Sequence, residues 1–139
     1  MRRIRRNSTK IYTIMIKTYE QTADKVLDWA EAKGIISADN PLKQLEKTQE
    51  ELDETKEALQ KIKDLEHPDL PLSSLSKAPA YSKLQDEVAD GIGDMLVTII
   101  ILAELVGMNS VDCLNVAYDE IKDRKGEMRD GLFVKEANL

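Results

Sequence analysis

Apolar residues recur with helical spacing in four segments of this chain, and turn-forming residues separate those segments. Apolar positions three or four residues apart predict amphipathic helices, while Gly, Pro and capping Asn or Asp residues mark the helix ends. The predicted helices cover residues 19–33, 41–66, 81–106 and 110–125. No segment shows a convincing strand pattern, and the residues after Gly126 are predicted to be irregular. The pattern therefore predicts an all-α fold, a bundle of four to five helices.

Two of the predicted helices carry unusual apolar features. In the second, Leu45, Leu52 and Leu59 recur every seven residues, and this stripe is predicted to face the core. In the third, residues 95–106 are apolar on nearly every side. Three other helices of this size leave part of that surface exposed. We therefore predict a homo-oligomer, a dimer or a tetramer, with residues 95–106 at the interface.

The chain is predicted to consist of a leader, one helical domain and a tail. Residues 1–15 contain five basic residues and are predicted to be a flexible leader. Residues 16–131 form the helical domain, and residues 132–139 form the tail. Within the domain, residues 67–79 contain three of the four prolines and three serines, which predicts a loop.

Charge and composition narrow the function classes. The formal net charge is -6, and the chain after the basic leader is more acidic still. Such a surface is unsuited to nucleic acid, whose affinity for proteins comes mainly from phosphate neutralisation. No secretory signal is found, and Glu104 interrupts an apolar run too short for a bilayer. We expect a cytoplasmic protein that binds neither nucleic acid nor membrane.

The supply of metal ligands is also narrow. Cys113 is the only cysteine and His67 the only histidine. The chain therefore has too few of these residues for an internal disulfide, a zinc site made of cysteines or a metal site made of histidines. Cys113 is predicted to be a small core residue, and Tyr118 is predicted to be in the core as well. A metal ion in this protein would have to be held by carboxylates.

Carboxylates cluster beside the apolar stripes of the second and third helices. Glu87, Asp90 and Asp94 precede the apolar run. At about 100° per residue these three lie within an arc of about 60°, and Glu51 and Glu54 are separated by about the same angle. Helices that face each other would bring both acidic strips together. A divalent cation makes such a cluster tolerable, and Mg²⁺ prefers carboxylate, water and phosphate oxygens.

The last helix offers groups that suit a phosphate. Asn115 and Lys122 are seven residues apart and lie on nearly the same line, and Lys125 follows one turn later. These residues are candidates for substrate contact. The alternative is that the cations only complement the dipole at the end of the helix.

These motifs resemble the all-α nucleoside triphosphate pyrophosphohydrolases, the MazG-like family that includes dimeric dUTPases and dCTPases. The family has an E-E-x-x-E helix, an E-x-x-D helix that leads into a long apolar segment, and a later helix with Lys or Arg. The counterparts here are "EELDE", "EVAD", "GIGDMLVTIIILAELVG" and "NVAYDEIKDRKG". The resemblance spans residues 19–131 and is strongest to short, phage-type members, whose "WA" and "GD" pairs match Trp29-Ala30 and Gly93-Asp94.

Two registers fit the second acidic motif. If Asp94 matches the final Asp of the family, Gly91 stands where the family has Glu, and Asp90 must supply that ligand. If Glu87 and Asp90 match instead, the motif is intact but the apolar segment begins four residues late. Both registers keep three acidic groups on one strip.

The resemblance implies hydrolysis of a nucleoside triphosphate to the monophosphate and pyrophosphate, with Mg²⁺, or Mn²⁺ as a substitute. The expected metal ligands are Glu51, Glu54, Asp90 and Asp94. Glu87 is expected either to be an alternative ligand or to support the ligands without contacting the metal ion. Glu50 is a candidate for activating the water, and with Glu51 and Glu54 it makes up the expected catalytic set.

Two questions stay open at this level. Trp29, the only tryptophan, either stacks on the base or anchors the first helix in the core. The competing function is a non-enzymatic helical adaptor or oligomerisation protein, which the heptad-spaced leucines favour, or a catalytically inactive relative. Thr48 and Thr55 occupy the intervening heptad positions, so a sustained coiled coil is disfavoured.

Overall fold

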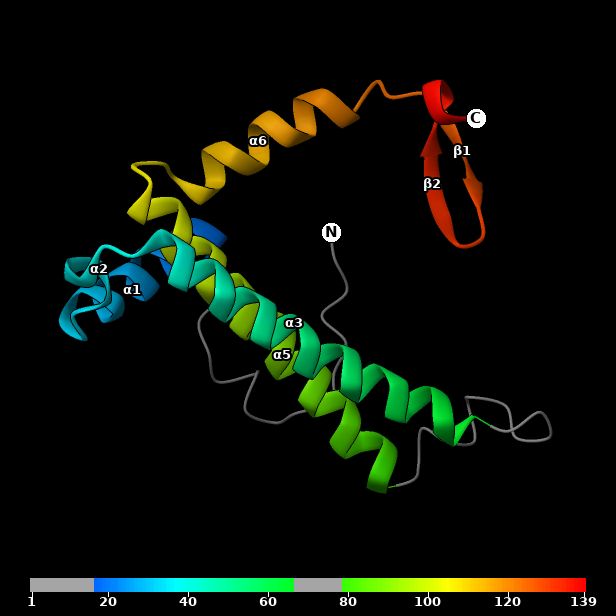
Figure 1. Ribbon diagram of the computed structural model, residues 1–139, viewed down its shortest axis with the longest axis horizontal. Coiled ribbons are helices and arrows are strands. Elements are labelled where there is room, and N and C mark those ends of the chain that lie inside the picture. Colours follow the sequence, from blue (N-terminus) through cyan, green and yellow to red (C-terminus); the bar gives the residue numbers. More distant parts are fainter. Residues whose placement is uncertain (1–16, 67–78) are drawn as a thin grey trace.

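The computed structural model describes residues 17–66 and 79–139. The predicted leader, residues 1–15, and the predicted loop, apart from its last residue, lie outside the described residues. The helices are α1 (Tyr19–Ala32), α2 (Ile35–Ala38), α3 (Pro41–Leu65), α5 (Pro79–Leu105) and α6 (Ser110–Ile121). They are followed by β1 (Gly126–Arg129), β2 (Leu132–Lys135) and the short 3-10 helix η2 (Glu136–Asn138) (Figure 1). The prediction of a predominantly helical protein is confirmed.

Local capping explains where the long helices begin. Thr18 and Gln21 form a capping box at the start of α1, because each side chain accepts a hydrogen bond from the other residue's backbone N–H. The side chain of Asn40 accepts from the N–H of Lys43, and Asn109 caps α6 in the same way. The four predicted helices are confirmed to within about four residues. Helix α2, a single turn after Gly34, was not predicted.

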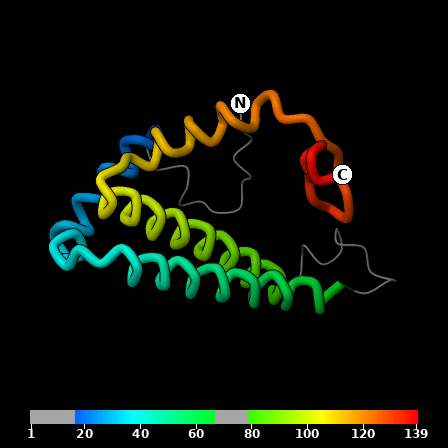
Figure 2. Tube along the Cα trace, turned by 45° about the horizontal axis from the view of Figure 1, so that its top comes forward, coloured from blue at the N-terminus to red at the C-terminus, as the bar shows by residue number. Residues whose placement is uncertain are grey.

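Helices α3 and α5 lie side by side and antiparallel, and α1 packs against α5 (Figures 1 and 2). The α3 side of this contact is made of small and polar residues, since its buried positions are Glu51, Thr55 and Ala58. One polar link joins the helices directly, because the amide of Gln44 donates to the backbone carbonyl of Thr98 at 3.2 Å. At these fully buried positions of α3, the contact with α5 is therefore one of close backbone approach rather than of interlocking large side chains.

The leucine stripe does not face this contact. Leu45, Leu52 and Leu59 are 52%, 47% and 51% exposed, so the prediction that they point into the core is wrong. The reason is the spacing of the small residues. Thr55 and Ala58 let α5 come close on one side of α3, and the leucines are left about a quarter turn away.

Helix α6 turns away from the α3–α5 pair. Its axis makes an angle of 100° with α5, and none of its residues is buried (Figure 1). Cys113 and Tyr118 are exposed, so the prediction that they are core residues is wrong. Among the described residues, no single helix is both long enough and apolar enough to span a membrane. Helices α5 and α6 have the necessary length and apolar composition only when they are taken together, as a bent pair.

The segment after α6 is a β-hairpin, so the prediction of an irregular tail is wrong. Strands β1 and β2 pair antiparallel, with Met128 opposite Phe133. Asp130 and Gly131 connect them with φ values of 49° and 80°, the left-handed geometry of a tight hairpin turn. The Asp-Gly pair was the sequence signal for this turn. The predicted boundary between residues 131 and 132 falls inside the hairpin.

Candidate active site

The candidate site lies beside a tight contact between α3 and α5. A Cβ atom added to Gly91 would lie 2.1 Å from Oγ1 of Thr55 and 3.1 Å from its Cβ. The Thr55 hydroxyl is held in place because it donates to the carbonyl of Glu51 at 2.7 Å. Only glycine fits at position 91, and this contact fixes how the two helices are aligned.

Carboxylates from both helices gather on one side of that contact. Glu54 immediately precedes Thr55, and Asp90 immediately precedes Gly91, so each projects from the edge of the contact. They line one cavity of about 280 Å³. The charged residues of its wall are Glu54, Glu57 and Lys61 from α3, and Glu87, Asp90 and Asp94 from α5. The predicted convergence of the two acidic strips is therefore seen for Glu54 with Glu87, Asp90 and Asp94.

The acidic groups are solvent-accessible and not gathered into a ready-made metal site. All five carboxylate residues of the cavity are exposed. Within residues 17–66 and 79–139, no set of three or more Asp, Glu, His or Cys residues is arranged to hold a metal ion. Mg²⁺ in phosphate-binding sites is usually held by one or two carboxylates together with water and substrate phosphates. The chemistry of this cavity fits a cation bound in that shared manner.

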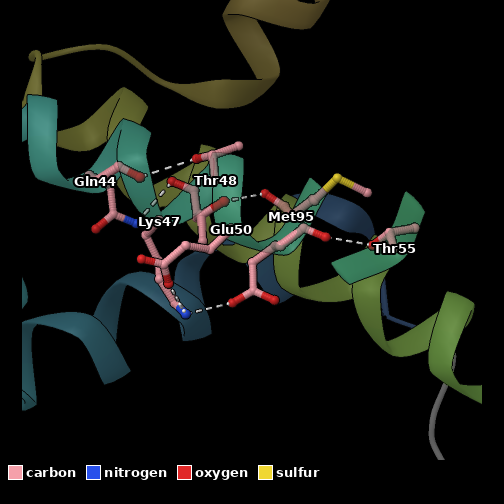
Figure 3. A network of polar contacts seen from close by, with 8 residues as sticks. Gln44, Lys47, Thr48, Glu50, Thr55 and Met95 are labelled. Atoms are coloured by element: carbon pink, nitrogen blue, oxygen red, sulfur yellow. Dashed lines mark hydrogen bonds and ion pairs between the residues drawn. The ribbon is translucent and has the colours of Figure 1, made fainter. Parts of the chain in front are cut away.

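Glu51 and Glu50 are not part of the cavity wall. Glu51 is 8% exposed, and its carboxylate lies 2.9 Å from the ammonium of Lys47. The same ammonium is 2.9 Å from the carboxylate of Glu50, and Figure 3 labels Lys47 and Glu50 in this network of polar contacts. The hydrogen bonds to Glu50 and then to Glu51 raise the pKa of Lys47. Both glutamates thus form ion pairs with Lys47, and neither lines the cavity to which Asp90 and Asp94 belong.

Two residues of the cavity were missed in the sequence. Glu57 and Lys61 are not among the candidate residues named from the sequence, yet both line the cavity. Both belong to the same side of α3 as Glu54, because they follow it by three and seven residues. The Lys61 ammonium is 3.2 Å from the Glu57 carboxylate. Helical spacing from Glu54 was the signal that would have found them.

The predicted substrate residues lie elsewhere in the chain. Lys122 is 3.1 Å from Asp119 on its own helix, and Asn115 and Lys125 are exposed on or after α6. None of them lines the acidic cavity. Trp29 is 50% exposed on α1, so it is not a buried anchor of that helix, and it lines neither this cavity nor the apolar one beside it.

A second, mostly apolar cavity of about 510 Å³ adjoins the acidic one. Its wall includes Tyr19 and Val26 of α1 and Leu96 of α5. The two cavities share Asp90 and Asp94. A ligand with an apolar ring at one end and charged groups at the other would therefore find both environments next to each other.

Comparison with known proteins adds no relative. The chain was compared with protein-family models, with curated proteins and with solved structures, and none of them matches it. The resemblance to MazG-like pyrophosphohydrolases rests on the motifs of the sequence, and the site rests on the geometry described above.

Proposed function

We propose that this protein is a Mg²⁺-dependent nucleoside triphosphate pyrophosphohydrolase, which converts a (d)NTP to the (d)NMP and pyrophosphate. The observation that carries the proposal is the acidic cavity, where carboxylates from α3 and α5 face one space beside a lysine. The motif resemblance to the MazG-like family supports the same reaction. The protein is further proposed to act in the cytoplasm as a homo-oligomer.

The proposed metal ligands are the carboxylates that share the cavity: Glu54, Asp90 and Asp94, with Glu87 as the alternative. When bound, Mg²⁺ neutralises phosphate charge and polarises the phosphoryl oxygens. Glu57 lies on the same wall and is close to Lys61. We assign it the role of orienting Lys61 toward the phosphates. Glu51 does not line the cavity, and its ion pair with Lys47 supports the helix that carries Glu54.

The two adjoining cavities suggest how a nucleotide would lie. The base and sugar would occupy the apolar cavity, between Tyr19 and Val26 on one side and Leu96 on the other. The phosphates would then extend past Asp90 and Asp94, which belong to both cavities, toward Lys61. An ammonium is suited to this end of the ligand because phosphate oxygens accept strong charge-assisted hydrogen bonds.

Replacing Lys61 by Gln is expected to raise KM for the nucleotide about tenfold, because a hydrogen bond from a charged donor to phosphate is lost. The matched control is Lys56→Gln, an exposed lysine of the same helix that does not line the cavity. Steady-state kinetics of pyrophosphate release measure both variants. Equal KM values for the two variants would remove Lys61 from the substrate site.

The proposed reaction is tested by measuring pyrophosphate from a panel of standard and modified nucleoside triphosphates, with Mg²⁺ and with EDTA. We expect the monophosphate and pyrophosphate as products, and no release in EDTA. If no member of the panel yields pyrophosphate with Mg²⁺, the enzymatic proposal fails. The exposed leucines of α3 would then favour the second candidate, a helical oligomerisation protein without catalysis.

A further inference from the structure

Two glycines lie two residues apart in α5, and packing accounts for only one of them. Gly91 is in tight contact with Thr55. Gly93 has ordinary helical geometry, since it lies inside α5 and its φ is not positive. Within residues 17–66 and 79–139, no atom lies within 4 Å of a Cβ atom built at Gly93, apart from the adjoining residues and the backbone of its own helix. Glycine is among the poorest helix formers, so its presence at position 93 has another cause.

Gly93 is at the centre of the α5 wall of the apolar cavity. At about 100° per residue, Ala89 and Val97 lie about 40° to either side of it, one turn before and one turn after. All three residues line the cavity. Because Gly93 has no side chain, the middle of this wall is helix backbone. A ligand in the cavity can therefore contact the backbone directly, and close approach of this kind is a common use of glycine in binding sites.

The other wall of the apolar cavity comes from α1. Its lining residues share one face of that helix, with the spacing i, i+3, i+4 and i+7, and they are Tyr19, Thr22, Ala23 and Val26. The Tyr19 hydroxyl lies 3.4 Å from Oγ of Ser110, at the start of α6. An aromatic side chain on one wall and bare helix backbone on the other suit a flat ring, which packs on aromatic groups by offset or edge contacts.

Gly93 is also beside the carboxylates that join the two cavities. Asp90 lies one turn earlier, about 60° round the helix, and Asp94 is the next residue. Both line the acidic cavity as well as the apolar one. Side chains three residues apart on a helix are neighbours, with Cβ atoms about 5–6 Å apart. A ligand whose phosphates are held through a metal ion at Asp90 would therefore have its adjoining, uncharged part at Gly93.

We infer that the nucleoside of the substrate packs against Gly93, and that the missing side chain sets the size of the group that the apolar cavity accepts. This inference rests on the proposed function and adds a specificity-determining residue to it. A side chain at position 93 would project into the cavity rather than into the packed chain, since the space beside it is open and Gly93 lines that cavity. The glycine then serves the ligand and not the fold.

Gly93→Ala and Gly93→Leu test this by placing a small and a large side chain in the cavity. For the panel substrate with the highest kcat/KM, KM should rise at least about tenfold in Gly93→Ala and further in Gly93→Leu, because space for the nucleoside is lost. The kcat of Gly93→Ala should stay within about threefold, since the metal ligands are unchanged. Ser82→Thr is the matched control, because it adds one methyl group to an exposed residue of α5 outside both cavities, and its KM should not change.

Inorganic tripolyphosphate separates a lost nucleoside contact from damage to the acidic cavity. As a competitive inhibitor it carries phosphates but no ring, so its inhibition constant in Gly93→Ala should stay within about twofold of that of the unmodified protein. A rise of this constant in parallel with KM overturns the inference. So does a KM in Gly93→Leu equal to that of the unmodified protein.

An unmodified protein without activity on the whole panel would refute the proposed function, and this inference with it. If the unmodified protein is active and Gly93→Ala keeps its KM, this inference alone fails. It also fails if Gly93→Ala is less stable to urea than the unmodified protein, or has a smaller mass in light scattering. Those results would mean that the fold, or a contact with a second copy, requires the glycine.

Discussion

Replacing Glu54 by Gln is expected to lower the rate of Mg²⁺-dependent pyrophosphate release by about a hundredfold or more, with no change in helix content. Glu54 is the residue of the E-E-x-x-E motif that lines the same cavity as Asp90 and Asp94. Gln keeps the size and the helix-forming tendency of Glu but removes the negative charge that a cation requires. The measurement is pyrophosphate release at saturating nucleotide and Mg²⁺, with circular dichroism of the same samples.

Glu46→Gln is the matched control for this prediction. Glu46 lies on the same helix, is exposed, and is 2.6 Å from Lys43 rather than in the cavity. Its substitution should leave the rate within about twofold, as expected for a surface position that touches no functional group. Equal activity of the Glu54 and Glu46 variants would contradict the assignment of Glu54.

Replacing Gly91 by Ala is expected to lower the free energy of unfolding by about 1–3 kcal/mol, although Ala is the better helix former. The added Cβ would lie 2.1 Å from Oγ1 of Thr55, closer than van der Waals contact allows. Rotation of the Thr55 hydroxyl away would break its hydrogen bond to the Glu51 carbonyl. Urea unfolding at matched protein concentration measures the change, because association contributes to apparent stability.

Gly93 provides a control of the same chemistry two residues away. No atom lies within 4 Å of a Cβ built there, so Gly93→Ala should be neutral or should raise the free energy of unfolding by up to about 1 kcal/mol. Adding Thr55→Ala to Gly91→Ala should recover at least about 0.5 kcal/mol through the coupling of the two positions. A Gly91→Ala protein as stable as the Gly93→Ala protein would show that α3 and α5 do not approach closely at Thr55.

The sequence was sufficient to predict the helices, because their signals are local. The capping residues Thr18, Asn40 and Asn109 begin helices where the side chain satisfies a free backbone N–H. The short α2 was missed because one turn of helix has no periodicity to detect. The β-hairpin was missed because its strands are only four residues long, although the Asp-Gly turn was visible.

The side of α3 that packs against α5 could not be predicted from hydrophobicity. The strongest apolar stripe, at Leu45, Leu52 and Leu59, is exposed, and the buried face contains Thr55 and Glu51. Burial here follows from how closely the backbones approach at Gly91, which depends on two helices at once. A pattern read along one helix does not distinguish a face buried within the chain from a face suited to a second chain.

The candidate site was predictable only in part, because a pattern along one helix does not show which residues of another helix it meets. Spacing correctly placed Glu87, Asp90 and Asp94 on one strip, and it placed Glu54 toward them. Glu51 follows the same periodicity, but its nearest charged partner is Lys47, one turn earlier on its own helix. The predicted contacts of Asn115, Lys122 and Lys125 required α6 to fold back on α3 and α5, and α6 points away instead.

The most direct test of the central claim is Mn²⁺ binding in the presence of a non-hydrolysable nucleoside triphosphate, followed by electron paramagnetic resonance as Mn²⁺ replaces Mg²⁺. The account predicts that the unmodified protein and Glu46→Gln bind the ion, and that Glu54→Gln and Asp94→Asn, one from each helix, each lose most of this binding. Unchanged Mn²⁺ binding in both cavity variants would show that α3 and α5 do not share a metal site.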